Sequence, residues 1–400
     1  MSVERMAARL RGLRGQTIFS EMTALAQQYD AVNLGQGFPD SDGPPGMLAA
    51  ATQAMTAGHN QYPPSVGVPA LRQQIAARRL ADHGVGYDPD GEVIVTAGAT
   101  EALAAALIGL CDRGDEVVVF DPLYDSYAAC ITMADARLRS VLLSYDGQRF
   151  SFDPDELRRA ITPRTRVLLL NSPHNPTGKV FDADELMLIA QLCCEHDLIA
   201  VTDEVYEYLV YDGLRHIPLA SLPGMRERTL TISSAGKSFS VTGWKIGWAC
   251  GPARLVGIVQ AVKQFLTFAT GAPLQHAVAY ALGEERAWVA QLQASLQMRR
   301  DLLVDSLNAL GIDTYRSQAT YFAQFDARSL GYPDGLTLCR VLATEAGVVG
   351  IPSVALYDDK AAGSHLIRLA FCKNEQTLTT ALERLSSYVA RLPDRPAVSS

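Results

Sequence analysis

From Glu92 onward, short runs of β-branched and apolar residues alternate with longer stretches of helical periodicity, and this alternation constrains the fold more than any other feature. Such alternation is typical of βα units that build a mostly parallel sheet covered by helices. We therefore predict an α/β fold. The predicted strands are 92–96, 116–121, 139–143, 166–171, 198–203, 229–233 and 246–250, and the predicted helices between them are 100–110, 126–134, 153–160 and 183–196.

Several predicted strands are apolar along nearly their whole length, as in residues 167–170. This is expected where helices cover both faces of a parallel sheet. Polar residues then stand at the C-terminal ends of three strands, namely Asn171, Asp203 and Ser233. Because ligands of open α/β sheets bind in the crevice outside those ends, we expect the functional site there.

The chain has 400 residues, more than one hydrophobic core usually supports, which favours two domains. After Pro252 the pattern changes to long amphipathic helices at 252–268 and 273–310, and mixed structure returns near Thr314. The first 44 residues show no clear strand pattern. We predict a large domain at 45–285, a smaller domain at 286–400, and an N-terminal segment at 1–44 that packs with the small domain.

Charge and composition exclude several classes of function. The 35 Lys and Arg residues against 43 Asp and Glu residues give a net charge of -8, which disfavours nucleic acid as a partner. No apolar run approaches the roughly 20 residues that cross a bilayer, and the first residues do not resemble a secretory signal, so we expect no membrane association and a cytoplasmic location. The cysteines and histidines lack metal-site spacing, so we expect no metal.

Lys237 is one of only six lysines and lies in the segment SSAGKSFSVTGWKIGW, directly after a predicted strand. The small, hydroxyl and aromatic neighbours suit a partly buried lysine. Burial lowers the pKa of an amine and so supplies a neutral nucleophile, as a Schiff-base lysine requires. Taken alone, an exposed loop lysine is the more frequent interpretation of such a residue.

Two further segments place polar side chains after predicted strands. Asp203 ends one strand, where its carboxylate is suited to face a buried cationic ring nitrogen, and Tyr206 follows three residues later. A helix cap followed by a core aromatic residue explains this pair equally well. Asn175 lies in the proline-punctuated loop NSPHNPTG, which would hold its amide rigidly, although the same loop also reads as an ordinary turn.

Small residues join a predicted strand to an apolar helix at Gly98, Ala99 and Thr100. Their size lets a phosphate approach the free backbone N–H groups of the helix start. Ser234 and Lys245 are candidates for an additional hydroxyl and counter-charge. An ordinary βα turn and a surface lysine remain the alternatives for these residues.

Together these segments closely resemble, in order, residue types and spacing, the fold type I, class I aminotransferases that use pyridoxal 5'-phosphate (PLP). The nearest subgroup holds kynurenine, glutamine and methionine aminotransferases and a succinyldiaminopimelate aminotransferase. The resemblance runs from about Asn33 to Thr379 and includes five separated motifs. It implies a large PLP-binding domain with a seven-stranded sheet, a smaller α+β domain, and transfer of an amino group between an L-amino acid and a 2-oxo acid in a ping-pong cycle.

The resemblance also implies a role for individual residues around the cofactor. Lys237 would form the internal aldimine and shuttle the proton, and Asp203 would pair with the pyridine nitrogen and keep it protonated. Asn175 and Tyr206 would bond the phenolic oxygen, and Tyr124 would stack on the ring. The phosphate would be held by Gly98, Ala99, Thr100, Ser234 and Lys245.

The same resemblance supplies substrate and partner contacts. Arg368 would grip the substrate α-carboxylate with its planar fork, and Gly37 would contact that carboxylate through its backbone. Tyr62 would reach the phosphate of a neighbouring subunit, which implies a homodimer with shared active sites. Many class I enzymes have an arginine at the position of Lys245. Lysine replaces the planar guanidinium fork of that arginine by the point charge of an ammonium group. Thr100 stands where kynurenine-type enzymes can carry an aromatic residue.

Two other functions stay open at this point. The same cofactor residues would serve β- or γ-elimination, replacement or carbon–carbon bond formation, because the groups that direct the carbanion cannot be placed from the sequence. A non-enzymatic regulator on this fold would be expected to lack the lysine or its acidic partner, or to carry a DNA-binding extension. Lys237, Asp203 and Arg368 are all present, which disfavours the regulator.

Overall fold

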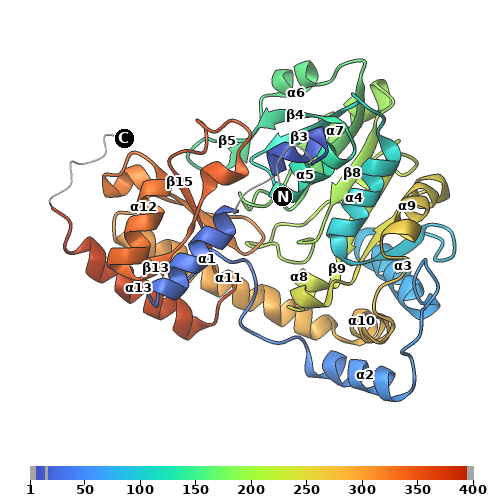
Figure 1. The fold of residues 1–400 in the computed structure, drawn as a ribbon, viewed down its shortest axis with the longest axis horizontal. Coiled ribbons are helices and arrows are strands. Elements are labelled where there is room, and N and C mark those ends of the chain that lie inside the picture. Colours follow the sequence, from blue (N-terminus) through green and yellow to red (C-terminus); the bar gives the residue numbers. More distant parts are fainter. Residues whose placement is uncertain (1–5, 14–16, 394–400) are drawn as a thin grey trace.

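The computed structural model of the protein describes residues 6–13 and 17–393 (Figure 1). A seven-stranded sheet, in the order β2–β10–β9–β8–β7–β3–β4, forms the middle of the larger lobe. β10 runs antiparallel to both neighbours, and every other neighbouring pair is parallel. Each strand agrees with its predicted range to within two residues, which confirms the α/β fold class. The strands are β2 (Val93–Thr96), β3 (Glu116–Asp121), β4 (Arg137–Leu142), β7 (Thr165–Asn171), β8 (Ile199–Asp203), β9 (Thr229–Ser234) and β10 (Gly247–Cys250).

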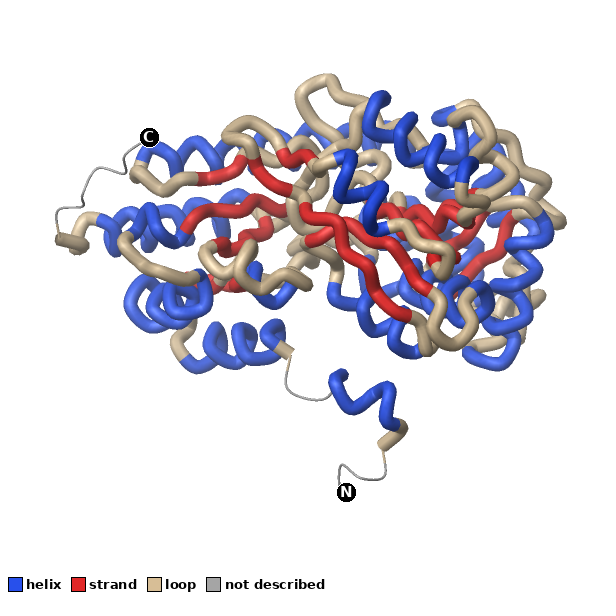
Figure 2. Tube along the Cα trace, turned by 90° about the horizontal axis from the view of Figure 1, so that it is seen from above, coloured by secondary structure: helices blue, strands red, loops and turns tan. Residues whose placement is uncertain are grey.

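Alternate side chains of the central strands enter different hydrophobic cores. Val117 and Val119 pack on one face of the sheet with α4, α5 and α9, whereas Val118 and Phe120 pack on the other face with α6 and α7. Figure 2 shows the strands between these helices. Because neither face meets water, the apolar strand pattern has a direct physical cause. The helices are α4 (Gly98–Leu110), α5 (Asp125–Met133), α6 (Pro154–Ala160), α7 (Ala183–Glu195) and α9 (Ala253–Leu266).

A second, four-stranded sheet lies in the smaller lobe, which is orange and red in Figure 1. Its order is β11–β12–β15–β14, and all neighbouring strands are antiparallel. Side chains of this sheet and of the surrounding helices form one core. The elements are β11 (Thr314–Tyr315), β12 (Phe322–Asp326), β14 (Ile351–Pro352), β15 (Leu366–Ala370), α11 (Arg286–Ala309), α12 (Gly335–Val341) and α13 (Glu375–Val389).

Residues 18–34 of the N-terminal segment join the smaller lobe, whereas the short helix at Ala8–Leu13 contacts α5 of the larger lobe. α1 (Ile18–Gln28) crosses the smaller lobe in Figure 1, and Met22 and Leu34 are buried in its core. β1 (Val32–Asn33) pairs in parallel with β13 (Val348–Val349). A strand of two residues is too short to produce a periodic pattern, which explains why no strand was predicted there.

One predicted helix is interrupted. The pattern at 273–310 predicts a continuous helix, but the chain forms α10 (Ala272–Glu284) and then α11, with Glu285 between them in a non-helical conformation. α10 packs on α2 (Pro45–Thr56) and α3 (Pro69–His83), whereas α11 packs on α13. A one-residue break leaves the apolar periodicity almost unchanged, so the pattern could not reveal it. The predicted boundaries at 44/45 and 285/286 stay predictions.

Within the described residues, every helix is too short or too polar to cross a bilayer.

A buried ion cluster anchors the segment that follows β8. Arg79 of α3 is 2% exposed and lies 2.9 Å from Glu204 and 2.7 Å from Glu207. Burial alone would raise the pKa of Glu204, but the charges of Arg79 and His216 outweigh burial and hold this pKa at about 2. Glu204 and Glu207 flank Val205 and Tyr206 in the sequence, so the cluster holds this stretch of backbone in place.

We predict that Arg79→Met lowers the free energy of unfolding by about 3–5 kcal/mol, because it removes the guanidinium that both buried carboxylates share. Arg113→Met is the matched control, since the Arg113 side chain is 90% exposed and should change little. Urea unfolding of the unchanged chain and of both variants measures the loss in the free energy of unfolding. In the unchanged chain the carboxylates contribute their stability above their ordinary pKa of about 4.3, and this contribution is lost as the pH falls toward 2. A loss no larger than that of Arg113→Met would contradict the prediction.

Candidate active site

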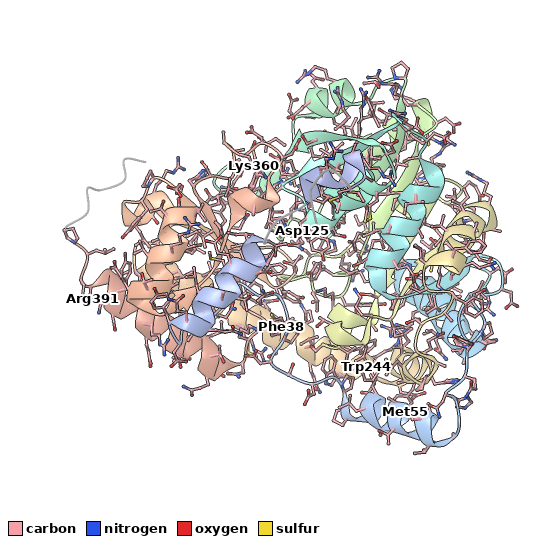
Figure 3. All side chains as sticks on the ribbon, in the orientation of Figure 1. Phe38, Met55, Asp125, Trp244, Lys360 and Arg391 are labelled. Carbon is pink, nitrogen blue, oxygen red and sulfur yellow. The ribbon has the colours of Figure 1, made fainter. Side chains whose placement is uncertain are left out.

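A chamber of about 390 Å³ opens at the C-terminal ends of the central parallel strands, where the two lobes meet. Phe38 and Asp125, labelled in Figure 3, line it from the N-terminal segment and from the start of α5. All site residues predicted from the sequence line this chamber except Tyr62. They are Gly37, Gly98, Ala99, Thr100, Tyr124, Asn175, Asp203, Tyr206, Ser234, Lys237, Lys245 and Arg368.

Lys237 lies in the short helix α8 (Ala235–Ser238) directly after β9. Its Nζ atom lies 2.8 Å from the Tyr321 hydroxyl, and the side chain is half-buried. Burial lowers the pKa of the amine to about 8, and the charges of Lys245 and Arg368 act in the same direction. A substantial neutral fraction therefore exists near neutral pH, as a nucleophilic or basic amine requires.

Asp203 ends β8 and is 4% exposed. Tyr127 of α5 donates its hydroxyl hydrogen to the carboxylate at 2.6 Å, and the backbone N–H of Val205 donates at 3.3 Å. Burial raises the pKa of Asp203, although these two hydrogen bonds and the charge of Lys237 oppose the increase. The carboxylate is therefore held in one orientation and is suited to a cationic partner inside the chamber.

The start of α4 combines close backbone packing with positive charge. Gly98 has a φ of +75°, and a Cβ atom there would lie 3.1 Å from Nζ of Lys245. A Cβ on Gly247 would lie 2.5 Å from the carbonyl carbon of Gly98, so space requires glycine at 247, whereas the positive φ favours glycine at 98. The N-cap residue Ala97 supplies no side-chain cap to the first N–H groups. The positive helix end, Lys245 and the neighbouring Ser234 thus form a site suited to a phosphate-sized anion.

Arg368 reaches the chamber from the small lobe on β15. Its two Nη atoms lie 3.2 Å from Oδ1 of Asn175 and 3.2 Å from the carbonyl oxygen of Gly35. The guanidinium lies 4.0 Å from the centre of the Phe322 ring. Its Nε is buried and has no partner among the residues that the structure describes. Burial lowers the pKa of Arg368 to about 10, so the group stays charged at neutral pH and keeps capacity to bind a carboxylate.

Two of the three predicted tyrosines border the chamber, and the third lies on the surface. Tyr206 is buried in the chamber wall, and its ring lies edge-on to Tyr321 with centroids 5.3 Å apart. Tyr124 lines the chamber, and burial raises its pKa to about 12. Tyr62 is 84% exposed and contacts only the edge of Phe268 among the described aromatic rings. The structure therefore does not bring Tyr62 to the chamber of its own chain.

Sequence reasoning missed three aromatic residues of this region. Tyr127 orients Asp203, Phe322 supports Arg368, and Tyr321 contacts Lys237. Tyr127 lies three residues after Tyr124 on the same helix face, a spacing that could have indicated it. Tyr321 and Phe322 adjoin a strand of another sheet, and no local pattern relates them to Lys237.

The chain matches the family model described as aminotransferase class I and II over residues 29–385. It is 53% identical to a probable N-succinyldiaminopimelate aminotransferase of Mycobacterium tuberculosis, over 95% of this chain and 97% of that protein. It is 38% identical to a methionine aminotransferase of Escherichia coli, over 93% of this chain and 95% of that protein. The solved structure of the N-succinyldiaminopimelate aminotransferase from Mycobacterium tuberculosis superposes with a TM-score of 0.93 at 52% identity, covering 96% of this chain and 100% of that one.

Proposed function

Because this chain belongs to the class I and II aminotransferases, we propose that its chamber binds PLP and that Lys237, Asp203 and Arg368 carry out the transfer of an amino group on it. The convergence of these three side chains in one chamber is the observation that carries the proposal. PLP, when bound, supplies an electrophilic carbon for the amino group and an electron-withdrawing ring. An L-amino acid would be the donor and a 2-oxo acid the acceptor.

The residues present fit this cofactor. The phosphate would lie at the start of α4, where Gly98 lacks a side chain and Lys245 supplies positive charge. Asp203 would meet the ring nitrogen, since Tyr127 already fixes the carboxylate. Asn175 and Tyr206 would bond the phenolic oxygen, and Tyr124 would cover the ring. Ala99, Thr100 and Ser234 complete the proposed phosphate contacts.

Lys237 would anchor the cofactor through its amino group and then move a proton. Its pKa of about 8 places the amine close to neutrality, where one group can both accept and return a proton. Nζ of Lys237 would therefore be the atom that accepts the α-carbon proton of a bound donor and later returns it. The surrounding apolar burial excludes water that would otherwise compete for this proton.

Arg368 would orient the donor by its α-carboxylate. The unpartnered Nε and two long hydrogen bonds leave its fork free to form a bidentate pair, and the backbone of Gly37 borders the same space. Holding the carboxylate fixes the direction of the α-carbon bonds relative to Lys237. Orientation of this kind supplies a large part of catalysis.

Two classes of donor have separate support. The 53% identity to the mycobacterial protein favours N-succinyldiaminopimelate. The chamber lining favours a donor with a neutral distal group, such as methionine, kynurenine or glutamine. Apart from Lys237, Lys245 and Arg368, the described lining contains no lysine or arginine, whereas it contains Asp125 and the rings of Phe19 and Phe38. An acidic side chain in an apolar wall disfavours a distal carboxylate.

We also propose that two copies form a dimer around an exposed apolar patch, defined as Tyr62, Phe265, Leu266 and Phe268. Tyr62 and Phe265 are each 84% exposed, and Tyr62 contacts the ring of Phe268. Large exposed apolar groups gathered on one surface mark an interaction site. The exposed position of Tyr62 suits its proposed contact with the phosphate held by the other copy.

We expect the purified chain with PLP to develop a visible absorption band, and a suitable amino acid without acceptor to change this band and release the matching 2-oxo acid. Titrating N-succinyldiaminopimelate, methionine, kynurenine and glutamine singly ranks the donors.

Lys237→Ala should abolish turnover without altering the circular dichroism, whereas Lys360→Ala, at an exposed lysine, should remain active. Repeated turnover by Lys237→Ala would contradict the role of Lys237, and ammonia release would favour elimination.

Arg368→Ala should weaken donor binding by about 2–5 kcal/mol, because the carboxylate loses a buried cationic partner. Arg368→Lys should fall between this variant and the unchanged chain, since it keeps the charge and loses the planar fork. The loss of donor affinity is measured by the steady-state KM and by the donor concentration at which the absorption band has completed half of its change. Equal values for the three proteins would place the carboxylate elsewhere.

Sedimentation equilibrium should give twice the 43.2 kDa chain mass for the unchanged protein. Phe265→Arg combined with Leu266→Arg should give single chains, because charges would be buried without partners. Met298→Arg is the control, since Met298 is 67% exposed on α11, outside the patch. Dissociation by Met298→Arg and not by the patch variant would place the interface on another surface.

A further inference from the structure

Tyr321 is a buried residue next to the chamber that the roles above do not use. It directly precedes β12 and is 1% exposed. Its hydroxyl oxygen lies 2.8 Å from Nζ of Lys237 and 2.6 Å from the carbonyl oxygen of Gly37. One side chain of the small lobe thus connects the reactive amine with the N-terminal loop that borders the carboxylate site.

The direction of these hydrogen bonds follows from the number of hydrogens. A phenol has one hydrogen, and Tyr321 donates it to Gly37. The hydroxyl of Tyr206 is the other acceptor that this hydrogen can reach. In both arrangements the hydrogen is in use, so Tyr321 can only accept from Lys237. This contact therefore favours a lysine nitrogen that carries a hydrogen toward Tyr321.

The loop on the other side of Tyr321 is held tightly. A Cβ atom on Gly37 would lie 2.4 Å from the Phe322 ring, so the backbone of this loop is pressed against the small lobe. The carbonyl of Gly35, two residues earlier, accepts a hydrogen bond from Arg368. The backbone from Gly35 to Gly37 therefore joins the hydrogen bond of Arg368 to those of Tyr321 and Lys237.

We propose that Tyr321 is a positioning residue that holds the amino group of Lys237 in the chamber and links it to the Gly37 loop. The consequence for catalysis rests on the proposed role of Lys237, but the contact itself does not require a cofactor. Removing the hydroxyl takes away the acceptor that stabilises the protonated amine. The amine should then lose its proton at a lower pH.

The other ionisable groups around Lys237 are retained in a Tyr321 variant. They are Cys372, Asp203, Lys245, Arg368 and Tyr206. A change in the protonation of Lys237 in a Tyr321 variant can therefore be assigned to the lost hydroxyl, provided that the core remains intact. Tyr388 supplies the matched control, because it is also buried in the core of the small lobe and pairs with Tyr332 at 2.7 Å, away from the chamber.

The test is pH-dependent amine labelling of the full chain stripped of PLP, with acetic anhydride as the probe and mass spectrometry of the peptide that contains Lys237. The unchanged chain and Tyr388→Phe should reach half-maximal labelling near pH 8. Tyr321→Phe should shift this midpoint down by about one pH unit, the size expected for one hydrogen bond to a charged group. With PLP and donor present, Tyr321→Phe should also raise KM more than it lowers kcat, because it frees the Gly37 loop.

An unchanged or higher midpoint in Tyr321→Phe would overturn the proposal, as would an equal shift in Tyr388→Phe. If Tyr321→Phe fails to fold, Tyr321→Met also removes the hydroxyl while a flexible side chain fills the space, and the same shift is expected. The labelling needs no PLP. A result for or against Tyr321 therefore stands separately from the assignment of the cofactor.

Discussion

Burial of the central parallel strands on both faces is the constraint on which the rest of this protein depends. Strands β7, β8 and β9 are buried along almost their whole length, so their interiors carry apolar or small hydroxyl side chains, and the larger polar groups stand where the strands end. Because these strands are parallel, their C-terminal ends meet at one edge. Asn171, Asp203 and Ser234 are delivered there together, and α4 begins beside them with its positive end toward the same space.

Burial also shifts the pKa values of the ionisable side chains in the chamber. An amine, a carboxylate and a guanidinium are all removed from bulk water, and each responds in the direction that desolvation requires. The pKa of Lys237 falls to about 8, that of Asp203 rises, and that of Arg368 falls to about 10. Hydrogen bonds and the charge of Lys237 oppose the increase at Asp203, and the pKa of about 8 places the Lys237 amine close to neutral pH.

The chamber is completed by parts of the chain that belong to other elements. Arg368 and Phe322 come from the small sheet, and Gly37 comes from the N-terminal segment, whose β1 pairs with β13 of the small lobe. Tyr321 joins these parts to Lys237 through two hydrogen bonds. The position of the small lobe thus affects both the guanidinium of Arg368 and the amine of Lys237 in the large lobe. The chain belongs to the class I and II aminotransferases, and we propose that this arrangement holds the amino group and the carboxylate of one substrate together.

The strands of the large sheet, the helices between them and about half of the residues that line the chamber could be predicted from the sequence. The strands and helices follow from local pattern, whereas Gly37, Tyr124 and Arg368 are indicated only by the family resemblance. Apolar runs specify buried strands, and Gly98, Asn175 and Lys237 lie in short segments with recognisable residue types. What only the tertiary structure decided concerns contacts between distant segments. The helical pattern is interrupted at Glu285, Tyr127 meets Asp203 across 76 positions, and Tyr321 meets Lys237 across 84. Side chains this far apart in the sequence become neighbours only when both sheets and their helices have packed, and no local periodicity records that outcome.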